Sequence, residues 1–251
     1  MNNDLFSVKD KTIVITGGGQ GIGEFLALEL SKRGANIFCV DKKFKKTKER
    51  IALHDIICDV TNLHDIKKTC MEIFKTNQRI DVLINNAGIT LPENSDSYSL
   101  KSWQKTLDVN LTGAFLFSQK VLNLMKRNRS GSIINITSIN AEFGFPNNPA
   151  YVASKGGLKM LSKSLARDWG KYGIRVNNLG PGYIITKMTE KSFQNKKTRD
   201  SRKSNTMLGR WGKPEDLLGP CIFLVSDASS YVTGQDIYVD GGWSANGLPI
   251  E

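Results

Sequence analysis

Tyr151 and Lys155 are two residues of this sequence whose types and spacing could do chemistry together. On a helix, a spacing of four residues places two side chains on the same face, one turn apart. A tyrosine is normally protonated at neutral pH, with a pKa of about 10, and a nearby ammonium group lowers that pKa. The pair could therefore exchange a proton with a substrate, although an ordinary surface pair on a helix would show the same spacing.

The elements that could position this pair follow one another in a regular order. Apolar runs rich in β-branched residues alternate with stretches of helical periodicity. The runs are continuous, which indicates strands buried on both faces, and the alternation predicts a parallel sheet with right-handed crossovers and helices on both faces. Strands are expected at residues 12–16, 36–41, 54–60, 81–86, 132–138, 174–180 and 236–241, and helices at residues 21–32, 65–77, 100–126, 151–172 and 214–226.

The pattern predicts a single α/β domain across residues 1–251, because no Pro/Gly-rich linker interrupts the chain. We expect a Rossmann-like, doubly wound domain with a seven-stranded parallel sheet. In such a sheet, ligands bind at the carboxyl ends of the strands. The residues that directly follow each apolar run are therefore the candidates for a binding site.

The first predicted strand leads into a glycine-rich turn, TGGGQGIG, at residues 16–23. Glycines let the backbone turn sharply and approach a ligand closely, and the next helix points free amide groups at a phosphate. The spacing of Gly17, Gly21 and Gly23 differs from the common G-x-G-x-x-G pattern. Its place between the first strand and the first helix nevertheless predicts a bound pyrophosphate.

The second predicted strand ends at Asp41. A carboxylate there would accept hydrogen bonds from the hydroxyls of an adenosine ribose and repel a 2′-phosphate, which favours NAD over NADP. Lys42 and Lys43 act in the opposite direction, because either could pair with a phosphate. We therefore expect NAD, with NADP as the alternative. Polar and small residues at the next two strand ends, Asp59-Val60 and the NNAG of residues 85–88, would form a floor for the adenosine.

The fifth predicted strand ends at Ser138, and Tyr151 follows 13 residues later at the head of a helix. The intervening segment is long enough to return the chain to the same edge of the sheet. Ser138, Tyr151 and Lys155 can then meet over one cleft. In that arrangement Tyr151 would act as a general acid–base, and Ser138 would steady the substrate oxygen.

The composition argues against several other kinds of protein. The four cysteines include no CxxC pair, so we expect reduced core residues in a cytoplasmic protein. Two histidines exclude a multi-histidine metal site, and we expect no metal. No run of about 18 apolar residues suggests a membrane span, and the first residues do not resemble a secretory signal peptide, so we expect no membrane partner.

The net charge of +11 is concentrated in two segments. Residues 42–50 carry six basic residues and one acidic residue, and residues 187–206 carry seven basic and two acidic residues, so each segment has a net charge of +5. We interpret the first segment as a solvated surface. Phe44 and Phe193 are the only aromatic residues in the two segments, which offers little for stacking bases, so we expect no nucleic-acid partner.

With these residues assembled, the chain resembles the short-chain dehydrogenase/reductase family over nearly its full length. The C-terminal run GRWGKPEDLLGPCIFLVSDASSYVTGQDIYVDGGW is also similar to this family. The other matching marks are TGxxxGIG at 16–23, NNAG at 85–88, Asn110 in LDVNLTG, Ser138, the Y-x-x-x-K of Tyr151 and Lys155, and PG at 181–182.

The resemblance implies hydride transfer between nicotinamide C4 and a carbonyl or secondary alcohol. Tyr151 would exchange the proton with the substrate oxygen, and Lys155 would lower the pKa of Tyr151 and hold the nicotinamide ribose. Ser138 would polarise the carbonyl, and Asn110 would anchor a water that links Lys155 to solvent. Members that prefer NADP often have a basic residue in place of Gln20, which again favours NAD. The implied cofactor-binding residues are Gly17, Gln20, Gly21, Ile22, Gly23, Asp41, Asp59, Val60, Asn86, Ala87, Gly88, Tyr151, Lys155, Pro181, Gly182, Ile184 and Thr186.

The resemblance also implies an assembly and a substrate loop. Family members commonly form tetramers through two long helices, here 100–126 and 151–172, so we expect a homotetramer or a homodimer. The substrate loop would be residues 187–206. Its low apolar content predicts mobility until a ligand binds, and its basic charge would suit an anionic small-molecule substrate.

The run GRWGKPEDLLGP…DGGW most resembles the gluconate and deoxygluconate dehydrogenase branch, which implies a sugar, sugar acid or polyol substrate. A 3-oxoacyl carrier-protein reductase is the alternative, because its acidic partner would suit the basic loop equally well. That enzyme would also need an apolar channel, for which the loop offers few residues beyond Met188, Phe193 and Met207. A non-catalytic nucleotide sensor and a nucleic-acid binder are more distant alternatives.

Overall fold

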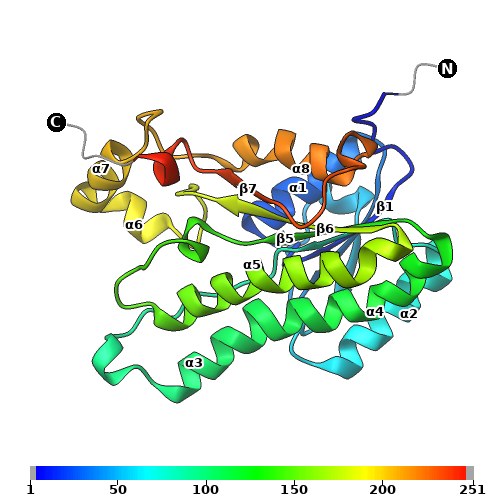
Figure 1. Ribbon diagram of the computed structural model, residues 1–251, viewed down its shortest axis with the longest axis horizontal. Helices are drawn as coiled ribbons and strands as arrows, with labels where there is room; N and C mark the ends of the chain where they lie inside the picture. The colour runs from blue at the N-terminus through cyan, green and yellow to red at the C-terminus, as the bar shows by residue number, and fades with distance from the viewer. Residues whose placement is uncertain (1–3, 247–251) are drawn as a thin grey trace.

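The computed structural model of the protein describes residues 4–246 and has a three-layer α/β architecture (Figure 1). Seven parallel strands form one sheet, as the sequence predicts, and their order is β3-β2-β1-β4-β5-β6-β7. The order reverses between β1 and β4, and this is the place where such sheets bind ligands. The strands are β1 (Thr12–Thr16), β2 (Asn36–Asp41), β3 (His54–Ile57), β4 (Val82–Asn85), β5 (Gly131–Ile136), β6 (Ile174–Pro181) and β7 (Asp236–Val239).

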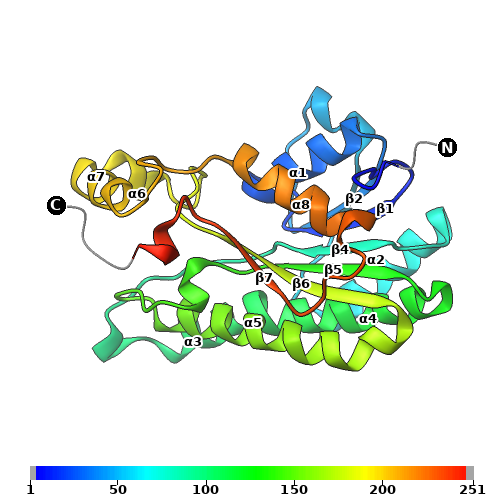
Figure 2. The same ribbon diagram turned by 45° about the horizontal axis from the view of Figure 1, so that its top comes forward.

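Helices cover both faces of the sheet, which Figure 2 shows as separate layers. In β1, Ile13 and Ile15 pack on the side of α1 and α8, whereas Val14 packs on the side of α2, α4 and α5. Both faces of the strand are therefore buried, which explains its continuous apolar run. The helices are α1 (Gly21–Lys32), α2 (Leu63–Asn77), α3 (Leu100–Leu107), α4 (Gly113–Asn128), α5 (Pro149–Trp169), α6 (Glu190–Gln194), α7 (Lys196–Ser204) and α8 (Leu218–Val225).

Two elements differ from the sequence prediction in ways that concern the site. β5 ends at Ile136, so Ser138 lies beyond the strand and begins a short 3₁₀ helix. The single helix expected at residues 100–126 consists of α3 and α4, joined by a π-helical turn at Asp108–Thr112. π-turns within helices often mark functional positions, and this one contains Asn110.

The segment of residues 187–206 is more structured than its low apolar content indicates. It forms α6 and α7, which extend beyond the sheet at the left of Figure 1. The side chain of Asn195 caps α7 by accepting the N–H of Thr198 at 3.0 Å, and Trp211 Nε1 donates to the carbonyl of Arg199 at 3.0 Å. The cap on α7 and the hydrogen bond from Trp211, which lies outside the segment, therefore stabilise helices that the low apolar content of residues 187–206 does not predict.

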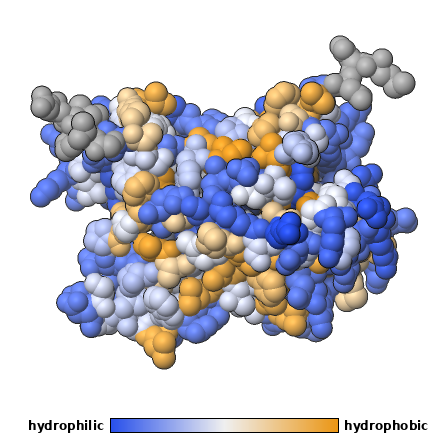
Figure 3. Space-filling model, in the orientation of Figure 1, coloured by the Kyte–Doolittle hydropathy of each residue, from blue (hydrophilic) through white to orange (hydrophobic). Residues whose placement is uncertain are grey.

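The face that carries α4 and α5 has apolar side chains gathered over its middle (Figure 3). Met160, on α5, is 60% exposed, and Phe115, Leu116 and Leu161 are only partly buried. This is the face on which the sequence predicts subunit contacts.

The four cysteines are buried and unpaired, in agreement with their interpretation as reduced core residues. Within residues 4–246, no helix is long and apolar enough to cross a membrane. The same residues contain no group of three or more His, Cys, Asp or Glu side chains that could hold a metal ion.

Candidate active site

The glycine-rich turn after β1 fits closely against the turn after β4. Gly17 and Gly21 have φ values of +66° and +61°, a region that favours glycine. A Cβ atom on Gly17 would lie 2.8 Å from the Cα of Ala87, and one on Gly23 would lie 2.3 Å from Asn86 Nδ2. The side chain of Gln20, at the start of α1, makes no capping hydrogen bond. The first amide groups of α1 are therefore without a side-chain cap, as a pyrophosphate site requires.

Asn86 holds the two turns together. Its Nδ2 donates to the carbonyl oxygens of Thr16 and Gly17, each at 3.0 Å. Thr16 Oγ1 in turn accepts the backbone N–H groups of Asn86 and Ala87, each at 3.1 Å. Both N–H groups of the Asn86 amide therefore serve to hold the glycine turn, and its Oδ1 is the atom that could still contact a ligand.

Asp41 is the last residue of β2 and lies beside the glycine turn. Its Oδ2 accepts the N–H of Gly19 at 2.9 Å, and its Oδ1 accepts the N–H of Lys42 at 2.7 Å, so the carboxylate is fixed beside the glycine turn. The Lys42 ammonium turns away to Asp59, 2.6 Å from its Oδ2. Burial raises the pKa of Asp59, but hydrogen bonds from Lys42 and Thr61 outweigh it and hold that pKa below its usual range.

Arg50 corrects the interpretation of residues 42–50 as a solvated surface. Its side chain is buried, with 3% exposed, and donates to Gly18 O at 3.1 Å, Glu24 Oε1 at 3.1 Å and Asp55 Oδ2 at 2.9 Å. The guanidinium therefore ties the glycine turn to α1 and to β3. No periodicity within 42–50 reveals this, because the partners come from distant parts of the chain.

Ser138, Tyr151 and Lys155 meet beyond the end of β5, as predicted. Ser138 is buried, and its Oγ accepts the N–H of Asn140 at 3.1 Å. Ser138 Oγ also donates to Asn140 Oδ1 at 3.3 Å, and the Ser138 side chain acts to lower the pKa of the nearby Tyr151 phenol. Lys155 Nζ lies 5.7 Å from the centroid of the Tyr151 ring and donates to the Ile136 carbonyl at 2.7 Å.

Burial shifts the pKa values of both Lys155 and Tyr151. Burial lowers the pKa of Lys155 to about 8. Burial also raises the pKa of Tyr151, and the hydrogen bond from Ser138 only partly opposes this. Desolvation of the phenolate is therefore the largest effect on the Tyr151 pKa in the chain by itself, and the Lys155 ammonium is directed at the Ile136 carbonyl; that Lys155 lowers the Tyr151 pKa stays a prediction.

Asn110 lies beside Lys155, in the π-turn. A Cβ on Gly88 would lie 3.5 Å from Asn110 Oδ1 and 3.6 Å from Lys155 Nζ, so the three residues converge. Asn110 Oδ1 accepts the N–H of Ile89 at 2.8 Å, and its Nδ2 donates to Ile89 O and to Ser154 Oγ, both at 3.0 Å. The amide thereby connects the turn after β4 to α5.

The segment that follows β6 packs closely against Asp240 and is hydrogen-bonded to Thr189. A Cβ on Gly182 would lie 2.6 Å from the Cα of Asp240, which excludes any larger residue there. Thr189 Oγ1 donates to the Ile184 carbonyl at 2.6 Å and accepts the N–H of Thr186 at 3.0 Å. Contacts with Asp240 and Thr189 thus hold the segment that contains the predicted nicotinamide-binding residues, which are Pro181, Gly182, Ile184 and Thr186.

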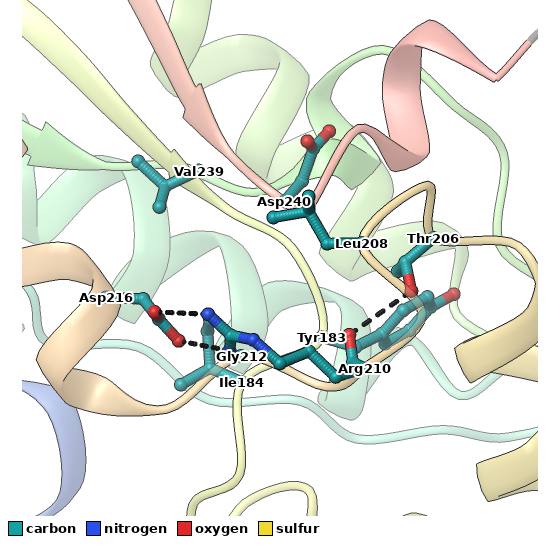
Figure 4. A pocket seen from close by; sticks show the side chains of 10 residues that line it. Tyr183, Ile184, Thr206, Leu208, Arg210, Gly212, Asp216, Val239 and Asp240 are labelled. Atoms are coloured by element: carbon teal, nitrogen blue, oxygen red, sulfur yellow. Dashed lines mark hydrogen bonds and ion pairs between the residues drawn. The ribbon is translucent and has the colours of Figure 1, made fainter.

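A cavity of about 130 Å³ lies beside this segment (Figure 4). Tyr183 and Ile184 line one part of it, and the guanidinium of Arg210 closes another by two hydrogen bonds of 2.7 Å to Asp216. Those bonds lower the pKa of Asp216 to about 2. Ser138, Tyr151 and Lys155 do not line this cavity, so it does not contain the candidate catalytic group.

Sequence reasoning did not find the aromatic cluster, defined here as Phe143, Tyr183, Phe193, Trp211 and Trp243. Its ring centroids are 5.1 Å apart for Phe143 and Trp243, 5.5 Å for Tyr183 and Trp211, and 5.3 Å for Phe193 and Trp211. The cluster joins the segments after β5, β6 and β7 to α6. The tryptophans in GRWG and DGGW were the available signal.

The chain is similar to known proteins along almost all of its length. A family model described as "Enoyl-(Acyl carrier protein) reductase" matches residues 17–244. A 2-dehydro-3-deoxy-D-gluconate 5-dehydrogenase of Bacillus subtilis is 37% identical, with 96% of this chain and 97% of that protein covered. A 3-oxoacyl-[acyl-carrier-protein] reductase of Thermotoga maritima is also 37% identical, over 94% of this chain and 98% of that protein.

Solved structures agree with this similarity. A gluconate 5-dehydrogenase from Burkholderia cenocepacia, crystallised in complex with NADP and tartrate, superimposes with a TM-score of 0.92. It is 35% identical and covers 96% of this chain and 98% of its own.

Proposed function

Because the chain belongs to the short-chain dehydrogenase/reductase family, we propose that it transfers a hydride between nicotinamide C4 of NAD(P) and a secondary alcohol or ketone of a sugar acid or related polyol. The convergence of Ser138, Tyr151 and Lys155 beyond β5 carries the proposal. The substrate class is supported by the relatives named for gluconate-type substrates and by the structure that holds tartrate, a small hydroxy acid.

Tyr151, Ser138 and Lys155 each have a separate role in the proposed reaction. Bound NAD(P) supplies the hydride acceptor or donor, and the glycine turn and Asp41 would hold it. During oxidation, the Tyr151 phenolate takes the hydroxyl proton as the carbon-bound hydrogen leaves as hydride. Ser138 donates a hydrogen bond to the substrate oxygen and holds it near the phenol. The Lys155 ammonium stabilises the phenolate, and a positively charged nicotinamide acts in the same direction.

Asp41 gives a prediction about the cofactor. Its carboxylate is fixed beside the glycine turn, and Lys42 is engaged by Asp59, so we propose a preference for NAD over NADP. Replacing Asp41 with alanine should weaken NADH binding roughly 10- to 100-fold, because hydrogen bonds to a charged group are lost. Fluorescence titrations of NADH and NADPH measure this, with Asp168→Ala at an exposed position as the control. Tighter binding of NADPH by the wild-type protein would contradict the assignment.

The 3-oxoacyl carrier-protein reductase is the second candidate, and the 37% identical Thermotoga maritima protein favours it. The two functions separate in one assay of the purified protein by absorbance of the reduced nicotinamide. We expect NAD(P)⁺ reduction with a hexonate such as gluconate, and little NAD(P)H oxidation with a 3-oxoacyl thioester. The reverse ranking of kcat/KM would establish the reductase instead.

A further inference from the structure

Arg202, on α7, lies against three aromatic rings of the site. Its guanidinium carbon is 4.4 Å from the ring centroid of Tyr183, 5.5 Å from that of Phe145 and 5.6 Å from that of Trp211. The side chain is partly buried. Aromatic faces attract a guanidinium and limit its hydration, so the group is held in place before any substrate arrives.

The charge of Arg202 is not compensated within residues 4–246. No carboxylate of these residues lies within 4.0 Å of its guanidinium, and its side chain donates no hydrogen bond to them. The neighbouring arginines differ, because Arg199 pairs with Asp200 at 3.3 Å and Arg210 pairs with Asp216 at 2.7 Å. Arg202 therefore offers a planar set of N–H donors, which is the geometry that matches a carboxylate.

Arg202 contacts two segments that neighbour the candidate site residues in the chain. Tyr183 directly follows the Pro181-Gly182 pair assigned to the nicotinamide end of the cofactor, and Phe145 lies between Ser138 and Tyr151 in the chain. Arg202, on α7, contacts an aromatic ring of each of these two segments.

We propose that Arg202 binds the carboxylate of the sugar acid and thereby selects anionic over neutral substrates. This inference rests on the proposed function and names the residue that binds the carboxylate of the substrate. The guanidinium binds one end of the substrate, while Ser138 and Tyr151 hold the oxygen of the reacting carbinol. Arg202 is thus a specificity-determining residue, and it takes no part in the proton transfer.

Variants of Arg202 distinguish this role from simple packing of α7. Arg202→Met keeps a long apolar side chain against the rings and removes the charge, whereas Arg202→Lys keeps the charge without the planar fork. Arg199→Met, on the same helix, is the matched control. The measurement is kcat/KM for a hexonate, the corresponding neutral hexitol and a hexitol phosphate, with the melting temperature of each variant.

We expect Arg202→Met to lower kcat/KM for the hexonate on the order of 100-fold, mostly through KM, and Arg202→Lys to recover part of it. Activity with the hexitol should change by less than about twofold, and Arg199→Met should resemble the wild-type protein. Equal losses for hexonate and hexitol would assign Arg202 to packing alone and overturn the inference. If Arg202→Met instead lowers kcat/KM selectively for the hexitol phosphate, the group that Arg202 binds is a phosphate and the proposed carboxylate is wrong.

A binding measurement covers the case in which turnover of the hexitol is too slow to follow. Titration with tartrate, followed by tryptophan fluorescence, should show weaker binding to Arg202→Met and unchanged binding to Arg199→Met. If the two variants bind equally while the wild-type protein oxidises hexonates, the inference fails and the proposed function stands. If the wild-type protein turns over no sugar acid, the proposed function fails and the inference falls with it.

Discussion

Replacing Tyr151 with phenylalanine should lower kcat between about 10²- and 10⁴-fold and leave cofactor affinity within about twofold. Phenylalanine fills the same space in the first turn of α5, so the cleft keeps its shape, but no phenol remains to take or give the proton. Lys155 and Ser138 stay in place, so the variant isolates the acid–base step. Steady-state kinetics and an NADH titration measure the two effects separately.

The control for this variant is Tyr231→Phe, because Tyr231 is fully exposed and remote in sequence from the site. It should match the wild-type protein in kcat, in KM and in cofactor binding. If Tyr151→Phe keeps more than about a tenth of the wild-type kcat, the proton comes from another group and the assignment of Tyr151 is wrong. Loss of NADH binding in the same variant would instead indicate a disturbed cofactor site.

Replacing Lys155 with methionine should abolish most activity and make the protein more stable at pH 7. Burial lowers the pKa of Lys155 to about 8, whereas the pKa in an unfolded chain is about 10.4. At pH 7 the folded protein therefore holds a buried charge at a cost of at most about 3 kcal/mol, partly offset by the hydrogen bond to the Ile136 carbonyl. Thermal unfolding should show a melting temperature several degrees above that of the wild-type protein.

The stability difference should depend on pH with a definite sign. Between about pH 8 and 10.4 the unfolded chain binds more protons at this lysine than the folded chain does, so wild-type stability rises with pH in that window. The advantage of Lys155→Met should therefore shrink as the pH rises from 8 to 10. Lys171→Met, at an exposed lysine, should show no such trend. A constant difference across this range would contradict the lowered pKa of Lys155.

The sequence predicts the sheet well because the pattern of each strand and each helix can be recognised within its own segment of the chain. Runs such as TIVIT are buried on both faces of a parallel strand, and the alternation of runs and helices leaves few topologies. The glycine turn is equally visible, because two of its glycines adopt positive φ values and others leave no space for a Cβ.

The remaining features depend on contacts between distant segments. The burial of Arg50 follows from Glu24 and Asp55, which lie on other elements, and its own segment reads as exposed charge. The order in residues 190–204 comes from Trp211 and from the aromatic cluster. The direction of the Tyr151 pKa shift depends on the burial of the phenol and on where Lys155 Nζ points. The four-residue spacing of Tyr151 and Lys155 in the sequence predicts neither.

The most direct test of the proposed function follows the hydride itself. The wild-type protein is incubated with NAD⁺ or NADP⁺ and a hexonate deuterated at the reacting carbinol carbon, and the reduced cofactor is examined by NMR. We predict that deuterium is recovered at nicotinamide C4 in one stereochemical position, with a keto acid as the second product. Absence of deuterium from the nicotinamide while the hexonate is consumed, or no consumption of any hexonate, would contradict hydride transfer from a sugar acid.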